Sequence, residues 1–345
     1  MRLVTMFNRL LTLTTHKIHQ LPILVLMPHS RCNCRCVMCD IWKANNDKRE
    51  IAVEELQRHM AQFVKLKVRE VIFSGGEALM HSNLWRLCSL FKECKIRITI
   101  LSTGLLLKKY AAEIIAHCDE VIVSLDGSQV VHDKIRNIPD AYSKLADGVM
   151  ELKKLNSDFK ISARCVLQRY NYFDFENIVK SAKEICLDKI SFLAADVTTA
   201  AFNHLEVRSD DQTSEVALNK REVEEFEVVI RNSFTNLAKE YSSKFISERP
   251  EKMLKLVHYY KALNGIGDYP ETICNAPWVS AVIESDGSVM PCFFHKPYGN
   301  IYDHDLLQII NSTEAINFRK KLNVKSNPIC KKCVCSLHIG LTQLN

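Results

Sequence analysis

Residues 21–40 read LPILVLMPHSRCNCRCVMCD, and this stretch joins a predicted strand to a predicted metal site. Its apolar half, residues 22–27, is a short run of the kind that forms a buried strand. Directly after that run, Cys32, Cys36 and Cys39 follow the spacing C-x3-C-x2-C. A loop with this spacing can fold three thiolates around a four-iron cube and leave the fourth iron open to a ligand.

A zinc site and a disulfide account for these cysteines less well. Zinc would require a fourth ligand, which Cys34 could supply, but four thiolates in so short a segment are cramped. A disulfide is disfavoured because the chain has no signal peptide and is far larger than the small secreted domains that depend on disulfides. We therefore favour an iron–sulfur cluster and interpret Cys34 as a bystander.

Five further apolar runs, alternating with helical patterns, follow the first one. The predicted strands are residues 22–27, 70–74, 96–101, 120–125, 160–166 and 189–193. The predicted helices between them are residues 53–66, 82–92, 107–117, 141–154 and 175–186. Strands that alternate with helices predict an α/β fold with a parallel sheet. Periodicity alone leaves an open sheet and an incomplete barrel as alternatives.

The composition is that of an ordinary globular protein: 345 residues, 47% hydrophobic and 25% charged, with a net charge of +6. No run of Lys or Arg predicts nucleic-acid binding. The apolar run 21–27 is too short to cross a bilayer, so we expect a cytoplasmic protein without stable membrane insertion. Residues 1–20 contain no acid. They could form a membrane-surface helix or a presequence, but a helix packed on the domain is favoured.

A second group of cysteines lies near the C-terminus. Cys274 and Cys292 flank a predicted hairpin, residues 279–284 and 288–292, and Cys330 and Cys333 form a C-x-x-C. Together they supply four thiolates, which suit a structural zinc ion about as well as a cluster. Cys335 could replace Cys333 or be free. The remaining cysteines are expected to pack in the core: Cys88, Cys94, Cys118, Cys165 and Cys186.

Polar and glycine-rich segments follow successive predicted strands. They are Ser74-Gly75-Gly76-Glu77, Ser102-Thr103-Gly104 and Ser124-Leu125-Asp126-Gly127, with His132-Asp133-x-x-Arg136 shortly after. Two adjacent glycines let a backbone approach a ligand closely. A guanidinium can bind a carboxylate in bidentate fashion. Each segment alone is a weak signal, but their placement after successive strands favours one shared site.

With these motifs the chain resembles the radical S-adenosylmethionine superfamily, whose signature is C-x3-C-x-Φ-C, with Met38 at the Φ position. Gly75-Gly76-Glu77 is similar to the family motif that binds the methionine amino group, although Ala78 stands where Pro is common. The resemblance implies a partial (β/α)6 TIM-like barrel. It also implies a [4Fe-4S] cluster on Cys32, Cys36 and Cys39 and a bound S-adenosylmethionine. The implied cofactor contacts are Met38, Ser74, Gly75, Gly76, Glu77, Ser102, Ser124, Asp126 and Arg136, with Arg164 as a more speculative one.

The C-terminal cysteines resemble the SPASM iron–sulfur domain in its shortened "twitch" form. This implies one auxiliary [4Fe-4S] cluster on Cys274, Cys292, Cys330 and Cys333, within a small α+β domain. The implied organisation is an N-terminal helix or extension (1–20), a radical core (21–204), a helical linker or substrate region (205–268) and the cluster domain (269–345).

The resemblance implies an oxidoreductase that cleaves S-adenosylmethionine reductively to a 5′-deoxyadenosyl radical and abstracts hydrogen from a substrate. An external one-electron donor such as flavodoxin or ferredoxin would supply the electron. The substrate would be a small molecule of the sugar or nucleoside type, or a peptide, and the auxiliary cluster would assist a net oxidation. Two alternatives stay open: a peptide maturase that modifies a precursor side chain, and a non-enzymatic electron carrier or zinc scaffold.

Overall fold

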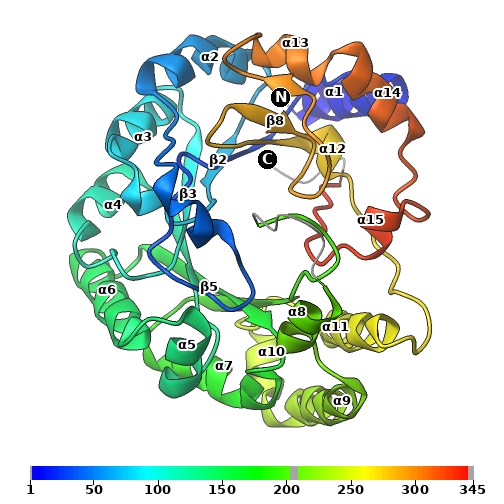
Figure 1. Cartoon of the computed structure of the whole chain (residues 1–345). Coiled ribbons are helices and arrows are strands. Elements are labelled where there is room, and N and C mark those ends of the chain that lie inside the picture. The colour runs from blue at the N-terminus through cyan, green and yellow to red at the C-terminus, as the bar shows by residue number, and fades with distance from the viewer. Residues whose placement is uncertain (1, 203–208, 341–345) are drawn as a thin grey trace.

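The computed structural model of the protein describes residues 2–202 and 209–340. Six parallel strands form the main sheet, and each lies within one residue of its prediction at both ends. They are β1 (Ile23–Leu26), β2 (Glu70–Phe73), β3 (Arg97–Ser102), β4 (Glu120–Ser124), β5 (Lys160–Leu167) and β6 (Lys189–Ala194). Figure 1 shows the strands curving around a central space with helices outside, so the predicted α/β fold with a partial barrel is confirmed.

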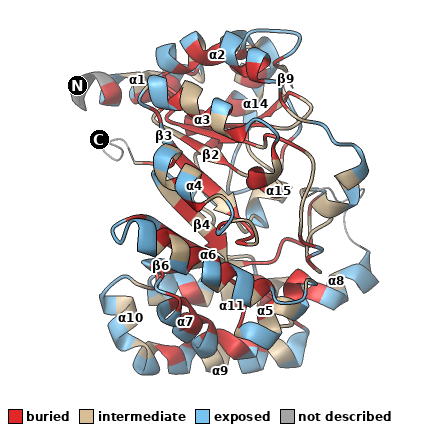
Figure 2. Ribbon diagram, turned by 90° about the vertical axis from the view of Figure 1, so that its left-hand side faces the viewer, coloured by how far each residue is buried: buried red, intermediate tan, exposed pale blue. Residues whose placement is uncertain are grey.

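The predicted helices are present on the outer face of the sheet: α2 (Val53–Lys65), α3 (Leu84–Glu93), α4 (Ala111–His117), α6 (Ala141–Leu155) and α7 (Phe175–Glu184). One more helix, α5 (Gln129–Arg136), follows β4 and was not predicted. The helices turn apolar stripes inward; in α2, for example, Leu56 and Phe63 are fully buried. Figure 2 shows the buried sheet behind helices whose outer surfaces are exposed.

Three short 3₁₀ helices lie in the loops: η1 (Ile41–Asn46), η2 (Ala78–Met80) and η3 (Tyr172–Asp174). Beyond β6, the chain forms α8 (Asp210–Val216), α9 (Lys220–Asn236), α10 (Ala238–Ser242) and α11 (Pro250–Leu263). The predicted start of the helical region at residue 205 lies outside the described residues. Helix α11 packs near β6, and the hydroxyl of Tyr260 donates to the backbone oxygen of Leu167, at the end of β5, at 2.6 Å.

The predicted hairpin near the C-terminus is present as β7 (Ser280–Ile283) and β8 (Ser288–Met290). Strand β7 also pairs in parallel with β1, and β8 pairs with β9 (Gly299–Asn300), so the barrel sheet continues into this region as nine strands. The sequence did not predict this pairing. It places Cys274 and Cys292, which flank the hairpin, beside the first strand of the barrel.

The remaining helices are α1 (Arg2–Thr15) at the N-terminus and α12 (Ala276–Val279), α13 (Leu306–Ile310), α14 (Thr313–Lys321) and α15 (Pro328–Lys331) near the C-terminus. Chain ends far apart in sequence meet here. The buried Arg319 of α14 donates to the backbone oxygen of His16 at 2.7 Å, and Arg9 of α1 donates to the backbone oxygen of Gly340. The N-terminal helix is therefore part of the folded body.

Candidate functional site: two cysteine-lined cavities

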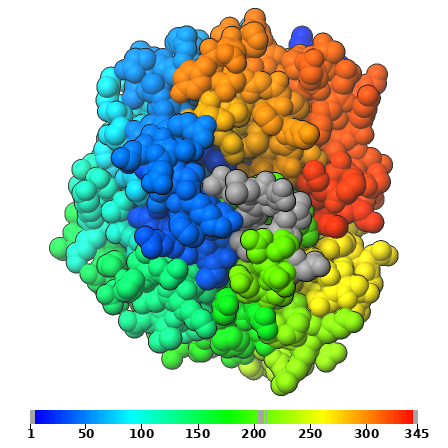
Figure 3. Space-filling view, in the orientation of Figure 1, coloured from blue at the N-terminus to red at the C-terminus, as the bar shows by residue number. Residues whose placement is uncertain are grey.

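The carboxyl ends of the barrel strands and loops that follow them surround a cavity of about 220 Å³. Ten of the predicted site residues line it: Cys32, Cys36, Met38, Cys39, Ser74, Gly75, Gly76, Ser102, Ser124 and Arg136. Glu77 and Asp126 are fully buried and do not line it. We call this space the first cavity. On the same face of the molecule, the segments around residues 30–50 (blue) and the C-terminal hairpin (orange) meet near the centre of Figure 3.

Backbone contacts on both sides fix the cysteine loop. The backbone N–H of Cys32 donates to the Asn45 side chain at 2.8 Å, and the Asn45 amide donates back to the Cys32 carbonyl at 2.9 Å. On the other side, the N–H groups of Arg35 and Val37 donate to carbonyl oxygens at the end of α5. Of the four cysteines in the loop, Cys32, Cys36 and Cys39 line the first cavity, whereas Cys34 is buried elsewhere.

Gly76 allows the loop after β2 to touch the cysteine loop directly. A Cβ atom at this position would lie 2.0 Å from the backbone oxygen of Arg31 and 2.9 Å from the Cβ of Cys32. The N–H of Glu77 donates to the same Arg31 oxygen at 3.1 Å. Here the glycine is required for close approach between two backbones, and the backbone that it approaches is that of the chain itself.

The carboxylate of Glu77 connects the loops after β2 and β3. It accepts hydrogen bonds from the N–H of Thr103 at 2.7 Å, from the Ser102 hydroxyl at 3.0 Å and from the N–H of Leu79 at 3.2 Å. Burial raises the pKa of Glu77, and these hydrogen bonds oppose that shift. The structure therefore places the Glu77 carboxylate inside the wall of the first cavity, and its predicted contact with the methionine amino group stays a prediction.

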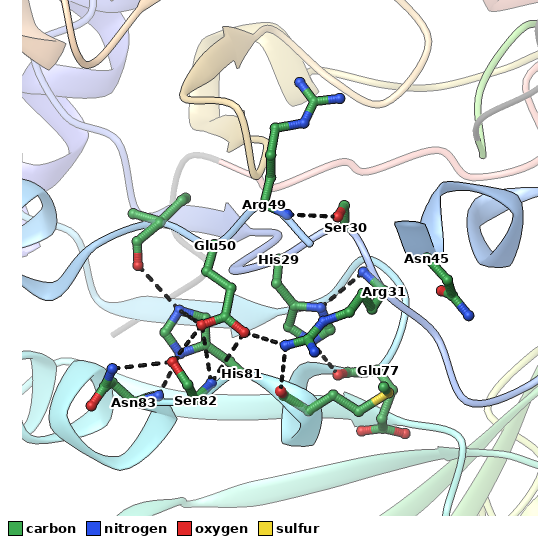
Figure 4. Close-up of polar contacts among 12 residues, drawn as sticks. His29, Ser30, Arg31, Asn45, Arg49, Glu50, Glu77, His81, Ser82 and Asn83 are labelled. Carbon is green, nitrogen blue, oxygen red and sulfur yellow. Dashed lines mark hydrogen bonds and ion pairs between the residues drawn. The ribbon is translucent and has the colours of Figure 1, made fainter. Parts of the chain in front are cut away.

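A second polar network supports the cysteine loop from the outside (Figure 4). Burial lowers the pKa of His29 to about 4, so its ring is neutral near pH 7. Because Nδ1 of His29 accepts from the N–H of Arg31 at 2.9 Å, its proton lies on Nε2, which is 2.5 Å from the backbone oxygen of Glu77. Arg31 also forms an ion pair with Glu50, and Glu50 bonds to Ser82. The loop before Cys32 is thus attached to the loop after β2 at several points.

Arg136 lines the first cavity, and its buried guanidinium contacts one of the cluster cysteines. It forms an ion pair with the fully buried Asp126, and its Nη1 donates to the Sγ of Cys36 at 3.4 Å. Asp126 in turn accepts from the N–H of Val166 at 2.9 Å. The two side chains thus bind each other in the structure, and their predicted contacts with the cofactor stay predictions.

The three cysteines differ in how readily they ionise. A hydrogen bond with Cys34 and the charge of Arg136 hold the pKa of Cys36 at about 6, against the opposing effect of burial. Burial raises the pKa of Cys32 and of Cys39 to about 12. Because iron binds the thiolate form, cluster binding would release protons from Cys32 and Cys39.

The four predicted C-terminal ligands line one space of about 200 Å³, which we call the second cavity. Cys274 precedes α12, Cys292 follows β8, and Cys330 and Cys333 lie in and just after α15. Cys335 also lines this cavity. Burial raises the pKa of Cys292 to about 12 and that of Cys330 to about 11. A set made entirely of thiols matches the ligand set of an iron–sulfur cluster.

The spacing of the sulfur atoms bears on the choice between zinc and a cluster. In the described part of the chain, no three His, Cys, Asp or Glu side chains are grouped so that they could hold one metal ion. A zinc ion draws all of its ligands to one atom, whereas a four-iron cube carries each thiolate on a separate iron. Groups made only of thiols, such as these two, are compatible with either kind of site.

The two cavities share a wall inside the barrel. Six residues line both of them: Ser74, Leu101, Ile122, Arg164, Phe293 and Cys335. Arg164, in β5, has a buried Nε without a hydrogen-bond partner among the residues that the structure describes. Cys335 differs from the four predicted auxiliary ligands because they line the second cavity alone. This difference supports the interpretation that Cys335 is a free thiol and not a ligand of the auxiliary cluster; we call it the spare thiol.

A larger cavity of about 410 Å³ adjoins the first one and shares Gly75, Gly76, Phe202 and Phe293 with it. Charged residues of both signs line it, including Arg49, Lys296, Glu284 and Asp286. Phe293 lines all three cavities. The larger cavity and the first cavity are therefore neighbours with a common wall.

Sequence reasoning missed several residues that shape the site. Asn45 and Thr103 hold the loops in place, and Phe293 joins the three cavities. Thr103 lies inside a motif that was recognised, so its position was a usable signal. Asn45 and Phe293 belong to no pattern, and only the folded chain brings them to the cysteines.

Comparison with known proteins gives two family matches. The model of the radical SAM superfamily matches residues 26–182, and that of SPASM, an iron–sulfur cluster-binding domain, matches residues 274–334. A cysteine-type anaerobic sulfatase-maturating enzyme from Clostridium novyi is 23% identical over 91% of this chain and 85% of its own. A Fe-coproporphyrin III synthase from Methanosarcina barkeri is 25% identical over 50% of this chain and 43% of its own.

Among solved structures, SuiB of Streptococcus suis with bound S-adenosylmethionine superposes with a TM-score of 0.65 at 16% identity, over 96% of this chain and 80% of SuiB. At this identity the likeness is one of fold. The chain spans about half the length of the first curated relatives that it matches, between 43% and 58%.

The Gly76→Ala substitution tests the contact between the cysteine loop and the loop after β2. The new methyl group would push the Arg31 carbonyl and Cys32 away, so we expect a loss of about 1–3 kcal/mol in stability and reduced iron in the anaerobically loaded protein. Thermal unfolding and iron analysis measure both effects. Val130→Ala is the control, because Val130 is 79% exposed on α5. Normal iron loading in Gly76→Ala would contradict the proposed contact.

The spare thiol is tested by iron analysis of two variants. We expect Cys292→Ala to lose about four iron atoms, the content of one cluster, and Cys335→Ala to retain them. Visible absorption and Mössbauer spectra identify which cluster is lost. An equal loss of iron in Cys335→Ala would show that this residue, rather than Cys333, is a ligand.

Proposed function

Because the chain belongs to the radical SAM superfamily and carries a C-terminal SPASM iron–sulfur domain, we propose that it is a peptide-modifying oxidoreductase. Cys32, Cys36 and Cys39 would hold the catalytic [4Fe-4S] cluster, and Cys274, Cys292, Cys330 and Cys333 the auxiliary one. When bound, S-adenosylmethionine and the reduced cluster supply a radical that can remove hydrogen from a C–H bond. The observation that carries the proposal is the shared wall between the two cysteine-lined cavities.

The chain's own residues would orient and protect the reacting groups. The Gly76 contact and the buried Glu77 hold the loops after β1, β2 and β3 in a fixed arrangement, so that a ligand in the first cavity meets preformed walls. Apolar residues of the shared wall, such as Leu101 and Ile122, exclude water from the space between the two cysteine groups. A substrate carbon there would be adjacent to both groups, which suits hydrogen removal followed by loss of an electron.

A peptide is the favoured substrate class for two reasons. SuiB has been solved with its precursor peptide, and the Clostridium novyi relative is named as a sulfatase-maturating enzyme. The larger cavity, with charges of both signs and apolar side chains, offers contacts to a peptide backbone and to varied side chains. A small-molecule substrate of the sugar or nucleoside type has no comparable support in the geometry.

Arg164 indicates that the proposed peptide substrate carries an acidic group. Its guanidinium lines both cysteine-lined cavities, and its Nε lacks a partner among the described residues. A buried donor without a partner costs free energy unless a ligand satisfies it. An acidic side chain or a terminal carboxylate of the peptide would do so at the shared wall.

Cleavage of the cofactor tests the enzymatic assignment. After anaerobic reconstitution and reduction, we expect the protein to release 5′-deoxyadenosine from S-adenosylmethionine. Cys36→Ala should release none above the reagent blank, because one of three cluster thiolates is lost. Cys94→Ala, at the end of α3, is a matched control and should behave as wild type. Release by Cys36→Ala at the wild-type rate would refute the cluster assignment, and no release by the wild type would support a carrier.

The substrate class is tested with a synthetic peptide library analysed by mass spectrometry. We expect the reconstituted protein to remove a pair of hydrogen atoms from a subset of peptides that contain an acidic group. Arg164→Gln should abolish this preference for acidic peptides, whereas Arg164→Lys should retain part of it. Modification without regard to acidic groups by the wild type would contradict the role given to Arg164.

A further inference from the structure

The N-terminal helix α1 is turned so that its polar side faces the protein. Thr5, Arg9 and Thr12, spaced one turn apart, are buried, each with 5% exposure or less. Met6, Phe7, Leu10 and Leu13 point away from the body, with exposures from 38% to 60%. A helix that packs on a globular domain ordinarily turns its apolar stripe inward. The helix packs on the domain, as expected from the sequence, but it does so through its polar side. Packing on the domain therefore does not account for its exposed apolar face.

Specific polar contacts fix the orientation of α1. Arg9 donates to the backbone oxygen of Gly340, and Arg69 donates to the hydroxyl of Thr5 at 3.4 Å. The N–H of His19 donates to the hydroxyl of Thr12 at 3.0 Å. Rotating the helix to bury its apolar side chains would break these contacts, so the apolar face is held outward.

Lysines lie near α1. Lys17 follows α1, Lys65 ends α2, and Lys67 lies in the turn before Arg69, which contacts α1; all three lysines are exposed. The sequence has no acid within residues 1–20 or 61–69. Val64, next to Lys65 in α2, is 53% exposed. An apolar stripe with cationic neighbours and without acids is the pattern of helices that lie in the interface of an anionic bilayer.

We propose that α1 docks the protein reversibly on anionic lipid surfaces, with Met6, Phe7, Leu10 and Leu13 inserted at the headgroup boundary. No helix within residues 2–202 and 209–340 is long and apolar enough to cross a membrane, so the contact is peripheral. A second copy of the chain is a less suitable binding partner for the apolar face of α1, because a twofold interface there would bring the lysines of both copies together. Lipid phosphates would instead neutralise them.

The docking face leaves the candidate active site accessible. Arg69, which contacts α1, immediately precedes β2, so α1 lies toward the amino ends of the strands. The cysteine loop and the first cavity are at the carboxyl ends. In Figure 2, α1 lies at the left edge, away from the loops that bear α8 and α15.

Vesicle flotation tests the proposal with the reconstituted full chain. We expect binding to phosphatidylcholine vesicles that contain phosphatidylglycerol, weaker binding to phosphatidylcholine alone, and loss of binding at high salt. The Phe7→Glu/Leu10→Glu variant should bind about tenfold more weakly or worse, since two inserted side chains become charged. Val130→Glu is the matched control, because Val130 is 79% exposed on α5 and should not matter.

Iron content and thermal unfolding confirm that the variants are folded. Lys65→Glu/Lys67→Glu should weaken binding to the phosphatidylglycerol vesicles more than to phosphatidylcholine alone. Equal binding by the wild type and Phe7→Glu/Leu10→Glu would overturn the proposal, as would no binding by the wild type. A wild-type dimer in light scattering that this double variant dissolves would assign the face to self-association instead. None of these readouts depends on catalysis.

Discussion

The close contact between the cysteine loop and the loop after β2 is the constraint on which the candidate site depends. At Gly76 the two backbones touch, and the N–H of Glu77 donates to the Arg31 carbonyl one residue before Cys32. The Glu77 carboxylate then joins the same wall to the loop after β3 through Thr103. Three loops that are separate in the sequence are thereby held as one rigid wall. Without this contact the three thiolates would have no fixed relation to the polar groups at the strand ends.

The continuation of the barrel sheet into the C-terminal region brings the second cysteine group next to the first. Because β7 pairs with β1, the segments that carry Cys274 and Cys292 lie beside the strand that leads into the first cysteine loop. The two cavities then meet inside the barrel at a mainly apolar wall, where Arg164 is the principal charged group. An arrangement of this kind keeps two redox sites close to one substrate while limiting the access of water.

Much of the fold could be predicted because its signals are local. Each strand of the barrel is a short apolar run, and each polar segment of the site directly follows such a run. The pairing of β7 with β1 could not be predicted, since strand pairing joins distant residues and a four-residue apolar run has many possible partners. The orientation of α1 could not be predicted for a similar reason: bonds from Arg9 to Gly340 and from Arg69 to Thr5 outweigh the apolar pattern of the helix itself.

The roles of the two arginines at the site follow from the cost of burying charge. Asp126 is fully buried, and removing its partner Arg136 to bind a ligand would leave an uncompensated charge, which costs about 3–5 kcal/mol in typical proteins. Arg136 is therefore committed to Asp126 and to the thiolate of Cys36. The Nε of each arginine lacks a hydrogen-bond partner among the described residues, but Arg164, unlike Arg136, forms no ion pair with any of them. A motif residue after β4 thus contacts a proposed cluster cysteine, whereas the arginine within β5, which belongs to no motif, is the one that we propose for a ligand.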